Sequence, residues 1–187
     1  EVLAGEENVR IVPGDMLELN PDELVQQDGY LVVANIPYYI TSALIRHLLE
    51  APQVPSRLVL TVQQEVAERI TAAPNDMSLL ALSVQVYGHP EIAARIPAGA
   101  FYPPPKVDSA VVRLAPRPPG EAGIQDPARF SAVVRAAFGQ RRKTLRNALA
   151  GLCGPEQFEA ACIAPGTRAE QVPVEGFVRL ANAACPD

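Results

Sequence analysis

The sequence has little of what marks a secreted or membrane protein. Its three cysteines, Cys153, Cys162 and Cys185, are odd in number and form no Cys-x-x-Cys pair. This pattern is typical of free thiols in a reducing compartment rather than of a disulfide framework or a zinc site. No apolar run approaches the roughly 18 residues of a membrane-spanning helix, and the first residues lack the basic start and apolar core of a signal peptide. We therefore expect a cytoplasmic protein with no membrane contact.

Histidine, lysine and an initiating methionine are also scarce or absent. His47 and His89 have no cysteine or carboxylate partners at metal-ligand spacing, so we interpret both as structural and expect no metal. The chain begins with Glu1, which we do not expect to be a natural start. The two lysines, Lys106 and Lys143, both fall inside segments that are singled out below.

Charge is distributed very unevenly along the chain. The net charge is −5, which by itself argues mildly against a nucleic-acid partner. Residues 1–30, however, carry eight acidic groups and one basic group, whereas residues 127–155 contain no Asp or Glu. The basic residues of the second stretch are Arg129, Arg135, Arg141, Arg142, Lys143 and Arg146. A local basic stripe matters more to a polyanion than the overall sum, and a solvated helix face is the alternative.

The first 115 residues predict alternating strands and helices. Apolar runs predict strands at residues 8–12, 30–34, 57–62 and 107–114, and helical spacing predicts helices at 42–50 and 63–71. The run at 30–34 is continuous, as in a strand that is buried on both faces. Residues 21–28 are expected to form a short helix or loop, and 79–86 a helix that becomes a strand from about Val84. This order is typical of an α/β fold with a mostly parallel sheet.

A segment rich in proline and glycine follows, and after it the pattern is purely helical. Residues 116–126 are predicted to be a linker between an α/β domain (1–115) and a helical domain (127–187). The candidate helices of the second domain are residues 129–138, 141–150, 155–161 and 173–184.

Asn35-Ile36-Pro37-Tyr38 directly follows the strand predicted at 30–34, which places it at the carboxyl edge of the sheet, where α/β sheets bind ligands. These residue types suit the methylation of the exocyclic amine of adenine. That amine is a poor nucleophile because its lone pair is delocalised into the ring. The Asn35 side-chain oxygen and the Ile36 carbonyl can accept hydrogen bonds from both amine hydrogens and favour a tetrahedral nitrogen. Pro37 fixes the turn, and Tyr38 offers a face on which an extruded base can stack. An ordinary strand-ending turn is the alternative.

A second segment, residues 101–112, begins with two aromatic residues and three consecutive prolines. The prolines predict a stiff loop, and the strand after them anchors it. Phe101 is a candidate for the second aromatic wall opposite Tyr38, and Lys106 for a phosphate contact. A proline-rich surface loop with a buried phenylalanine is the alternative.

The third segment, residues 138–149, combines an apolar face with a cluster of positive charge. We predict a helix with its basic residues at the N-terminal half, which suits a phosphate backbone. These candidate RNA-binding residues are Arg141, Arg142, Lys143 and Arg146.

Together, and in this order and spacing, the three segments resemble the dimethyladenosine transferase family that modifies small-subunit ribosomal RNA. Residues 63–69, 82–84 and 168–171 resemble further blocks of that family, so the resemblance spans nearly the whole chain. It implies a partial Rossmann-like class I methyltransferase sheet followed by a small all-helical RNA-binding domain. It also implies S-adenosylmethionine-dependent N6,N6-dimethylation of two adjacent adenines in small-subunit (16S) ribosomal RNA, during assembly of the subunit.

The resemblance further implies a set of cofactor contacts. Asp15 and Met16 would hold the adenine of S-adenosylmethionine, with Asn35 as a further contact. The family's first strand, its glycine-rich turn and the acidic residue after its second strand are expected before residue 1. We therefore expect these 187 residues to bind the cofactor poorly and to be inactive alone. Residues 77–81 also read Met-Ser-Leu-Leu-Ala where the family has a Tyr-Gly pair.

Two other functions compete with this reading. One is a related methyltransferase that modifies large-subunit ribosomal RNA and confers antibiotic resistance. The other is a non-catalytic RNA-binding factor of ribosome assembly that keeps the fold. A DNA adenine methyltransferase is less favoured, because a basic helix after the catalytic domain follows the ribosomal RNA pattern.

Overall fold

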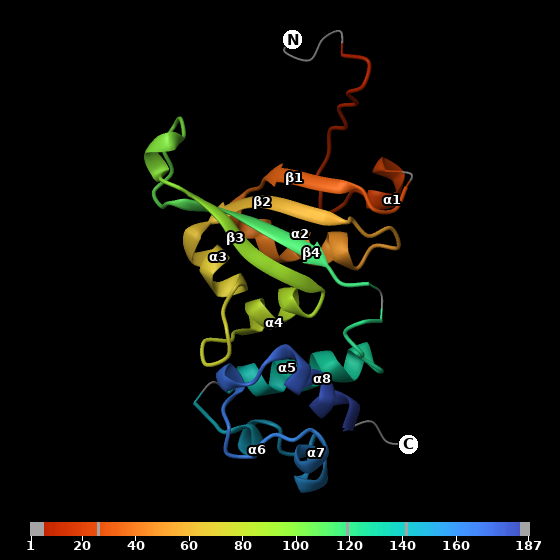
Figure 1. Cartoon of the computed structure of the whole chain (residues 1–187), viewed down its shortest axis with the longest axis vertical. Coiled ribbons are helices and arrows are strands. Elements are labelled where there is room, and N and C mark those ends of the chain that lie inside the picture. Colours follow the sequence, from red (N-terminus) through yellow and green to blue (C-terminus); the bar gives the residue numbers. More distant parts are fainter. Residues whose placement is uncertain (1–5, 26, 119, 141, 184–187) are drawn as a thin grey trace.

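The computed structural model of the chain describes residues 6–25, 27–118, 120–140 and 142–183. Its centre is a four-stranded sheet with helices packed on one face, and further helices extend the molecule along its long axis (Figure 1). The strands are β1 (Leu31–Asn35), β2 (Arg57–Gln63), β3 (Gly88–Ile96) and β4 (Ser109–Pro116). The helices of this half are α1 (Pro21–Leu24), α2 (Thr41–Leu49), α3 (Gln64–Ile70) and α4 (Leu79–Gln85), with short 3-10 helices η1 (Tyr38–Ile40) and η2 (Ala98–Ala100).

The sheet has the order β1-β2-β4-β3 and is mixed rather than mostly parallel. Only β1 and β2 run parallel, whereas β4 is antiparallel to both β2 and β3. The sequence-based prediction of a mostly parallel sheet was therefore wrong. Parallel neighbours need a crossover connection, usually a helix, as α2 provides between β1 and β2. No α-helix lies between β3 and β4, which are joined only by a loop with η2, so these strands pair antiparallel.

The two faces of the sheet differ sharply in burial. Helices α2, α3 and α4 cover the face that presents Leu58, Leu60 and Val62, none of which is exposed. On the other face of β1, Leu31 is 68% exposed and Val33 is 79% exposed. The prediction that this strand is buried on both faces was wrong, because no described element covers the second face.

Residues 8–12 form no strand, contrary to the prediction. Val9, Ile11 and Val12 are all exposed in a segment that runs away from the sheet (Figure 1). A strand is stable only when a neighbour takes up its backbone hydrogen bonds. No described strand lies beside this segment to do so.

Helical spacing was a reliable guide around the sheet. In α2 the predicted apolar face, Leu44, Ile45, Leu48 and Leu49, is buried. Helix α4 continues to Gln85, so the predicted change to a strand at about Val84 comes slightly too early. Strand β3 starts at Gly88, where an added Cβ atom would lie 2.4 Å from the carbonyl oxygen of Ala115. Only glycine fits at that crossing.

The C-terminal half is helical, as predicted, and packs around a second apolar core. Its elements are α5 (Pro127–Gly139), α6 (Leu145–Ala148), α7 (Pro155–Ala160), η3 (Ala169–Gln171) and α8 (Val174–Ala183). The rings of Phe138 and Phe177 lie 5.5 Å apart between α5 and α8. Helix α4 contributes Leu82 to this core and Val84 to the core under the sheet, so it links the two halves. The division into domains at residues 116–126 stays a prediction.

The helix predicted at residues 141–150 is much shorter than expected. Among residues 142–150, which the structure describes, only Leu145–Ala148 is helical, and Thr144 is extended. Thr144 forms a β-bridge with Arg168, and the backbone N–H of Leu145 donates to the carbonyl of Thr167 at 2.8 Å. These pairings with a distant segment hold the backbone before Leu145 out of the helix.

Candidate active site

The carboxyl edge of the sheet gathers several connections at one place. Strands β1 and β2 run parallel, so Asn35 at the end of β1 lies beside Thr61 near the end of β2. Strand β4 begins where β2 ends, with Ser109 opposite both Gln63 and Ile96. The loop between β3 and β4 therefore projects from the same edge as the segment after β1 (Figure 1). This is the edge at which α/β sheets bind ligands.

The segment after β1 combines a buried side chain with exposed neighbours. Ile36 is 7% exposed and belongs to the core under the sheet, whereas Asn35 and Pro37 on either side of it are exposed. The carbonyl of Pro37 accepts a hydrogen bond from the N–H of Ile40 at 3.2 Å, which closes η1. Helix α2 begins at once with Thr41, which is buried. A buried apolar anchor thus holds a polar side chain at the surface of the sheet edge.

Two tyrosines, Tyr38 and Tyr39, follow Pro37 in this segment. The backbone of Tyr38 starts η1, but its side chain lies outside the described residues. Its neighbour Tyr39 is 89% exposed. The role of Tyr38 as a stacking wall stays a prediction.

The β3–β4 loop, residues 97–108, carries Phe101 and Lys106, as predicted, and is held at its base by Asp108. Phe101 is half-buried and Lys106 is exposed. The Asp108 carboxylate accepts from the N–H of Ala98 at 2.8 Å, and the Asp108 carbonyl accepts from the N–H of Gln64 at 3.0 Å. Because Gln64 begins α3, these two bonds tie both ends of the loop to the end of β2.

The turn predicted to hold the cofactor's adenine lies near the same core. Met16 is half-buried and packs against the cluster that contains Ile36. The exposed Asp15 carboxylate accepts from the N–H of Leu17 at 2.9 Å within its own turn. The Nε2 atom of His47, on α2, lies 2.8 Å from the carbonyl oxygen of Leu19. A carbonyl only accepts hydrogen bonds, so Nε2 donates, and His47 attaches this turn to the helix that follows Asn35.

The basic residues of the helical half lie far from these loops. Arg142 and Lys143 are exposed on the turn between α5 and α6, and Arg146 is exposed on α6. Arg141 lies outside the described residues. Helix α6 lies toward the opposite end of the long axis from the β3–β4 loop (Figure 1). The structure thus places Asn35 and Phe101 at one edge and keeps the predicted RNA-binding cluster apart from them.

Sequence reasoning missed four residues whose positions bear on the site. Tyr102 is fully exposed beside Phe101, and Asp108 and His47 make the anchoring contacts described above. The backbone bridge to Thr144 brings exposed Arg168 next to the segment that carries Lys143, and the Arg168 side chain pairs with Glu170 at 4.0 Å. The run Phe101-Tyr102 was a visible signal, but the other three depend on partners that are distant in the sequence.

Among the described residues, no group of three His, Cys, Asp or Glu side chains is arranged to hold a metal ion. In the same part of the chain, no helix combines the length and apolarity needed to cross a membrane.

Comparison with protein families gives a match over almost the whole chain. The model described as "Ribosomal RNA adenine dimethylase" matches residues 1–185. A protein of Xanthomonas axonopodis pv. citri named "Ribosomal RNA small subunit methyltransferase A" is 45% identical over 176 residues, which cover 93% of this chain and 67% of the relative. A protein of the same name from Dehalococcoides mccartyi is 44% identical over 96% of this chain and 64% of its own length. The chain spans about two thirds of the length of these relatives.

Solved structures show the same fold. The crystal structure of the 23S rRNA methyltransferase ErmE superposes with a TM-score of 0.74 at 26% identity, over 97% of this chain and 74% of that one. A dimethyladenosine transferase from Plasmodium falciparum superposes with a TM-score of 0.76 at 23% identity, over 96% of this chain and 73% of that one. The mixed sheet and its helices are therefore those of a Rossmann-like methyltransferase.

Proposed function

The chain belongs to the ribosomal RNA adenine dimethylase family, and from this premise we propose that its protein dimethylates N6 of two adjacent adenines in small-subunit ribosomal RNA. The family consists of S-adenosylmethionine-dependent methyltransferases. One observation carries the proposal for these residues. The segment Asn35–Pro37 and the loop with Phe101 leave the sheet at the same edge, as a site that grips an extruded base requires.

The chain's own part in the reaction is to hold the adenine amine. The Asn35 side-chain oxygen and the Ile36 carbonyl each accept a hydrogen bond from one N6–H group, which leaves the nitrogen lone pair free to attack. Phe101 stacks on the ring and fixes its plane. S-adenosylmethionine, held in part by Asp15 and Met16, would supply the methyl group on a sulfonium sulfur, and that sulfur would keep the electron pair of the C–S bond. As the N–C bond forms, N6 becomes positively charged and acidic and loses one proton to water, so no strong base is needed.

The described residues fit only part of the cofactor. Asp15 provides a carboxylate acceptor for an adenine amine, and Met16 provides an apolar neighbour. A Rossmann-like site also needs closely spaced glycines that cradle the cofactor's polar groups. Gly5, Gly14 and Gly29 are too far apart in the sequence to form that cradle. Residues 1–187 alone should therefore bind S-adenosylmethionine weakly, with a dissociation constant well above the micromolar range.

Isothermal titration calorimetry of residues 1–187 with S-adenosylmethionine tests this expectation. Micromolar affinity would contradict it, and would show that the Asp15 turn and the Asn35 segment suffice for binding.

The choice of small-subunit RNA rests on relatedness. The relatives named for the small subunit are about 45% identical, whereas the 23S rRNA methyltransferase is 26% identical. The assembling small ribosomal subunit is the partner that this implies.

Free thiols and an RNA substrate also favour a cytoplasmic location. Cys153 is buried, which raises the pKa of its thiol and makes it unreactive.

The decisive experiment measures methyl transfer by the full-length protein to purified small-subunit and large-subunit RNA separately. We expect transfer to the small-subunit RNA only. Asn35→Ala should lower kcat by about 100- to 1000-fold, as the loss of one catalytic hydrogen-bonding group does elsewhere, while RNA affinity is kept. The matched control is Asn8→Ala, the same substitution at an exposed position outside the site. Transfer that persisted in Asn35→Ala would favour the rival view of a non-catalytic assembly factor that co-purifies with an enzyme.

A further inference from the structure

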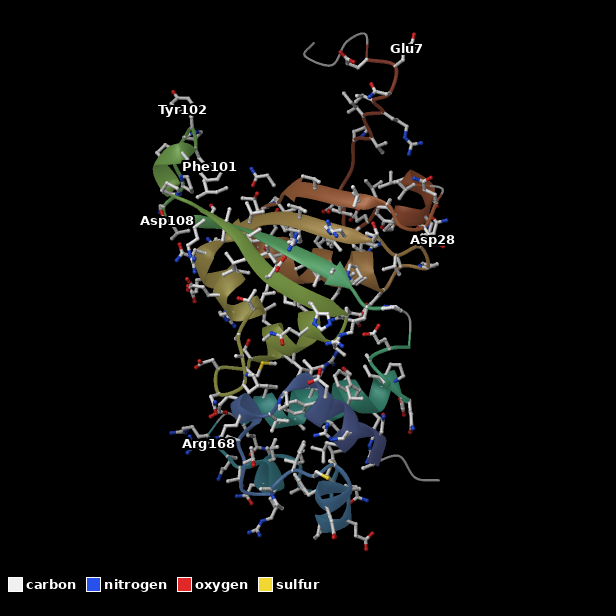
Figure 2. All side chains as sticks on the ribbon, in the orientation of Figure 1. Glu7, Asp28, Phe101, Tyr102, Asp108 and Arg168 are labelled. Carbon is white, nitrogen blue, oxygen red and sulfur yellow. The ribbon has the colours of Figure 1, made fainter. Side chains whose placement is uncertain are left out.

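Tyr102 is an aromatic side chain with no contact to explain it. It is 100% exposed at the tip of the β3–β4 loop, at the active-site edge (Figure 2). Phe101, its neighbour in the chain, is half-buried. The Phe101 backbone is extended, with φ −108° and ψ 153°. Consecutive side chains point to opposite sides of an extended backbone, so Tyr102 faces away from the side occupied by Phe101.

The loop that carries Tyr102 is held in place before any ligand arrives. The 3-10 helix η2 is closed by a bond of 2.9 Å from the N–H of Ala100 to the carbonyl of Pro97. Asp108 ties the base of the loop to Ala98 and Gln64. Residues 103–105 after Tyr102 are all proline, which restricts the backbone further. With the backbone ordered, only the two side-chain torsions of Tyr102 remain to be fixed when a base stacks on its ring, which keeps the entropy cost small.

The charge of the loop suits a polyanion. Residues 97–107 contain no acidic side chain and one basic side chain, that of Lys106, which is exposed. The Asp108 carboxylate is already engaged with Ala98. An exposed aromatic ring and an exposed cation on one loop are the combination that binds unpaired nucleotides, in which bases stack and phosphates pair with the cation.

We propose that Tyr102 is a stacking platform for the unpaired nucleotide next to the target adenine, with Lys106 at the phosphate that joins them. The proposal rests on the proposed function, since Phe101 is there the wall for the target base. Phe101 and Tyr102 then stack on two neighbouring bases, on opposite sides of the loop. Such an arrangement splays the strand and selects single-stranded RNA, because a base within a duplex offers no free face.

The test uses an RNA hairpin whose loop holds two adjacent adenines flanked by 2-aminopurine, a fluorescent base that stacking quenches. Binding to the full-length protein is measured without cofactor, by anisotropy and by quenching. Tyr102→Ala should weaken binding about 5- to 150-fold and abolish part of the quenching. Tyr102→Phe should match the wild type, whereas Tyr102→Leu should behave like Tyr102→Ala. Leu79→Ala, at an exposed apolar residue of α4, is the control expected to change nothing.

The outcomes separate this subsite from the proposed function. If Tyr102→Ala bound the hairpin more weakly and the wild type methylated no RNA, the Tyr102 subsite would be supported and the proposed methyltransferase function would be contradicted. Unchanged binding and quenching in Tyr102→Ala would overturn the subsite, as would full recovery in Tyr102→Leu or failure of the wild type to bind the hairpin. Circular dichroism of each variant verifies folding, which a fully exposed side chain is not expected to affect.

Discussion

The two sides of the candidate site are built very differently. The side assigned to the target adenine consists of Asn35–Pro37 and the β3–β4 loop, and both are anchored in the sheet, by buried Ile36 and by Asp108. The side assigned to the cofactor is the turn at Asp15 and Met16. In the segment before that turn, residues 8–12, the side chains of Val9, Ile11 and Val12 are exposed and no strand forms.

This difference shows what a strand-end site needs. Strand β2 pairs with β1 on one side and with β4 on the other, so the positions of the loops at the ends of these strands are fixed by the sheet. The Asp15 turn lies outside the sheet; contacts with the core and with His47 hold it, together with the bond that Arg10, before the turn, donates to the carbonyl of Leu24, after it. Substitutions at matched positions on the two sides should therefore have unequal effects.

The largest expected effect comes from the buried anchor of the adenine side. Ile36→Ala should lower the free energy of unfolding by about 2–5 kcal/mol, because it leaves a cavity in the core under the sheet. The matched substitution on the other side, Ile11→Ala, removes a side chain that is 75% exposed and should change it by less than about 0.5 kcal/mol. Urea denaturation followed by circular dichroism measures both. Equal losses would show that the two sides are equally anchored.

The next effect concerns the base of the β3–β4 loop. Asp108→Ala removes the acceptor of the Ala98 N–H and should loosen the loop by about 1–2 kcal/mol. Hydrogen exchange at the Ala98 amide should then be about 5- to 30-fold faster, and kcat should fall with it. Asp108→Asn keeps an acceptor oxygen and should restore most of the protection. If both variants exchanged alike, the bond to Ala98 would not be what holds the loop.

A smaller effect is expected from His47, the link to the cofactor side. His47→Leu removes the donor to the Leu19 carbonyl, at a cost of about 0.5–1.5 kcal/mol. Affinity of the full-length protein for S-adenosylmethionine, measured by calorimetry, should fall about 2- to 10-fold. His47→Gln carries an N–H that can replace Nε2 and should recover it. An unchanged affinity in His47→Leu would show that the turn does not depend on α2.

The sequence predicted best where local pattern and tertiary neighbours agree. The apolar spacing of α2, the strand that ends at Asn35 and the loop with Phe101 are all present. Strand β1 pairs with β2, the next strand along the chain, and β4 lies beside β2 in the same sheet. The sequence signals for Asn35 were its place after an apolar run, the residue types Asn-Ile-Pro-Tyr and the family resemblance. The structure puts Asn35 at the end of β1 beside Thr61 of β2, and its role in catalysis stays a prediction.

The predictions failed where structure depends on partners that are distant in the sequence or are not described. Residues 8–12 have strand composition but no neighbouring strand among the described residues, so they form no strand. Residues 142–144 have helical spacing, but the bridge from Thr144 to Arg168 overrides it. That bridge also brings Arg168 to the basic cluster, which no linear pattern around residue 143 reveals. Only three-dimensional pairing supplies this information.

The smallest expected effect tests the uncovered face of the sheet. Val33 is 79% exposed on β1, whereas Val62 on β2 is fully buried under the helices. Val33→Thr should change the free energy of unfolding by less than about 0.5 kcal/mol. Val62→Thr places a hydroxyl group in an apolar core and should cost about 1–3 kcal/mol. Both residues are β-branched valines in one sheet, so strand propensity cancels and burial alone separates them. A loss in Val33→Thr as large as that in Val62→Thr, measured by urea denaturation of residues 1–187, would show that this face is covered in solution.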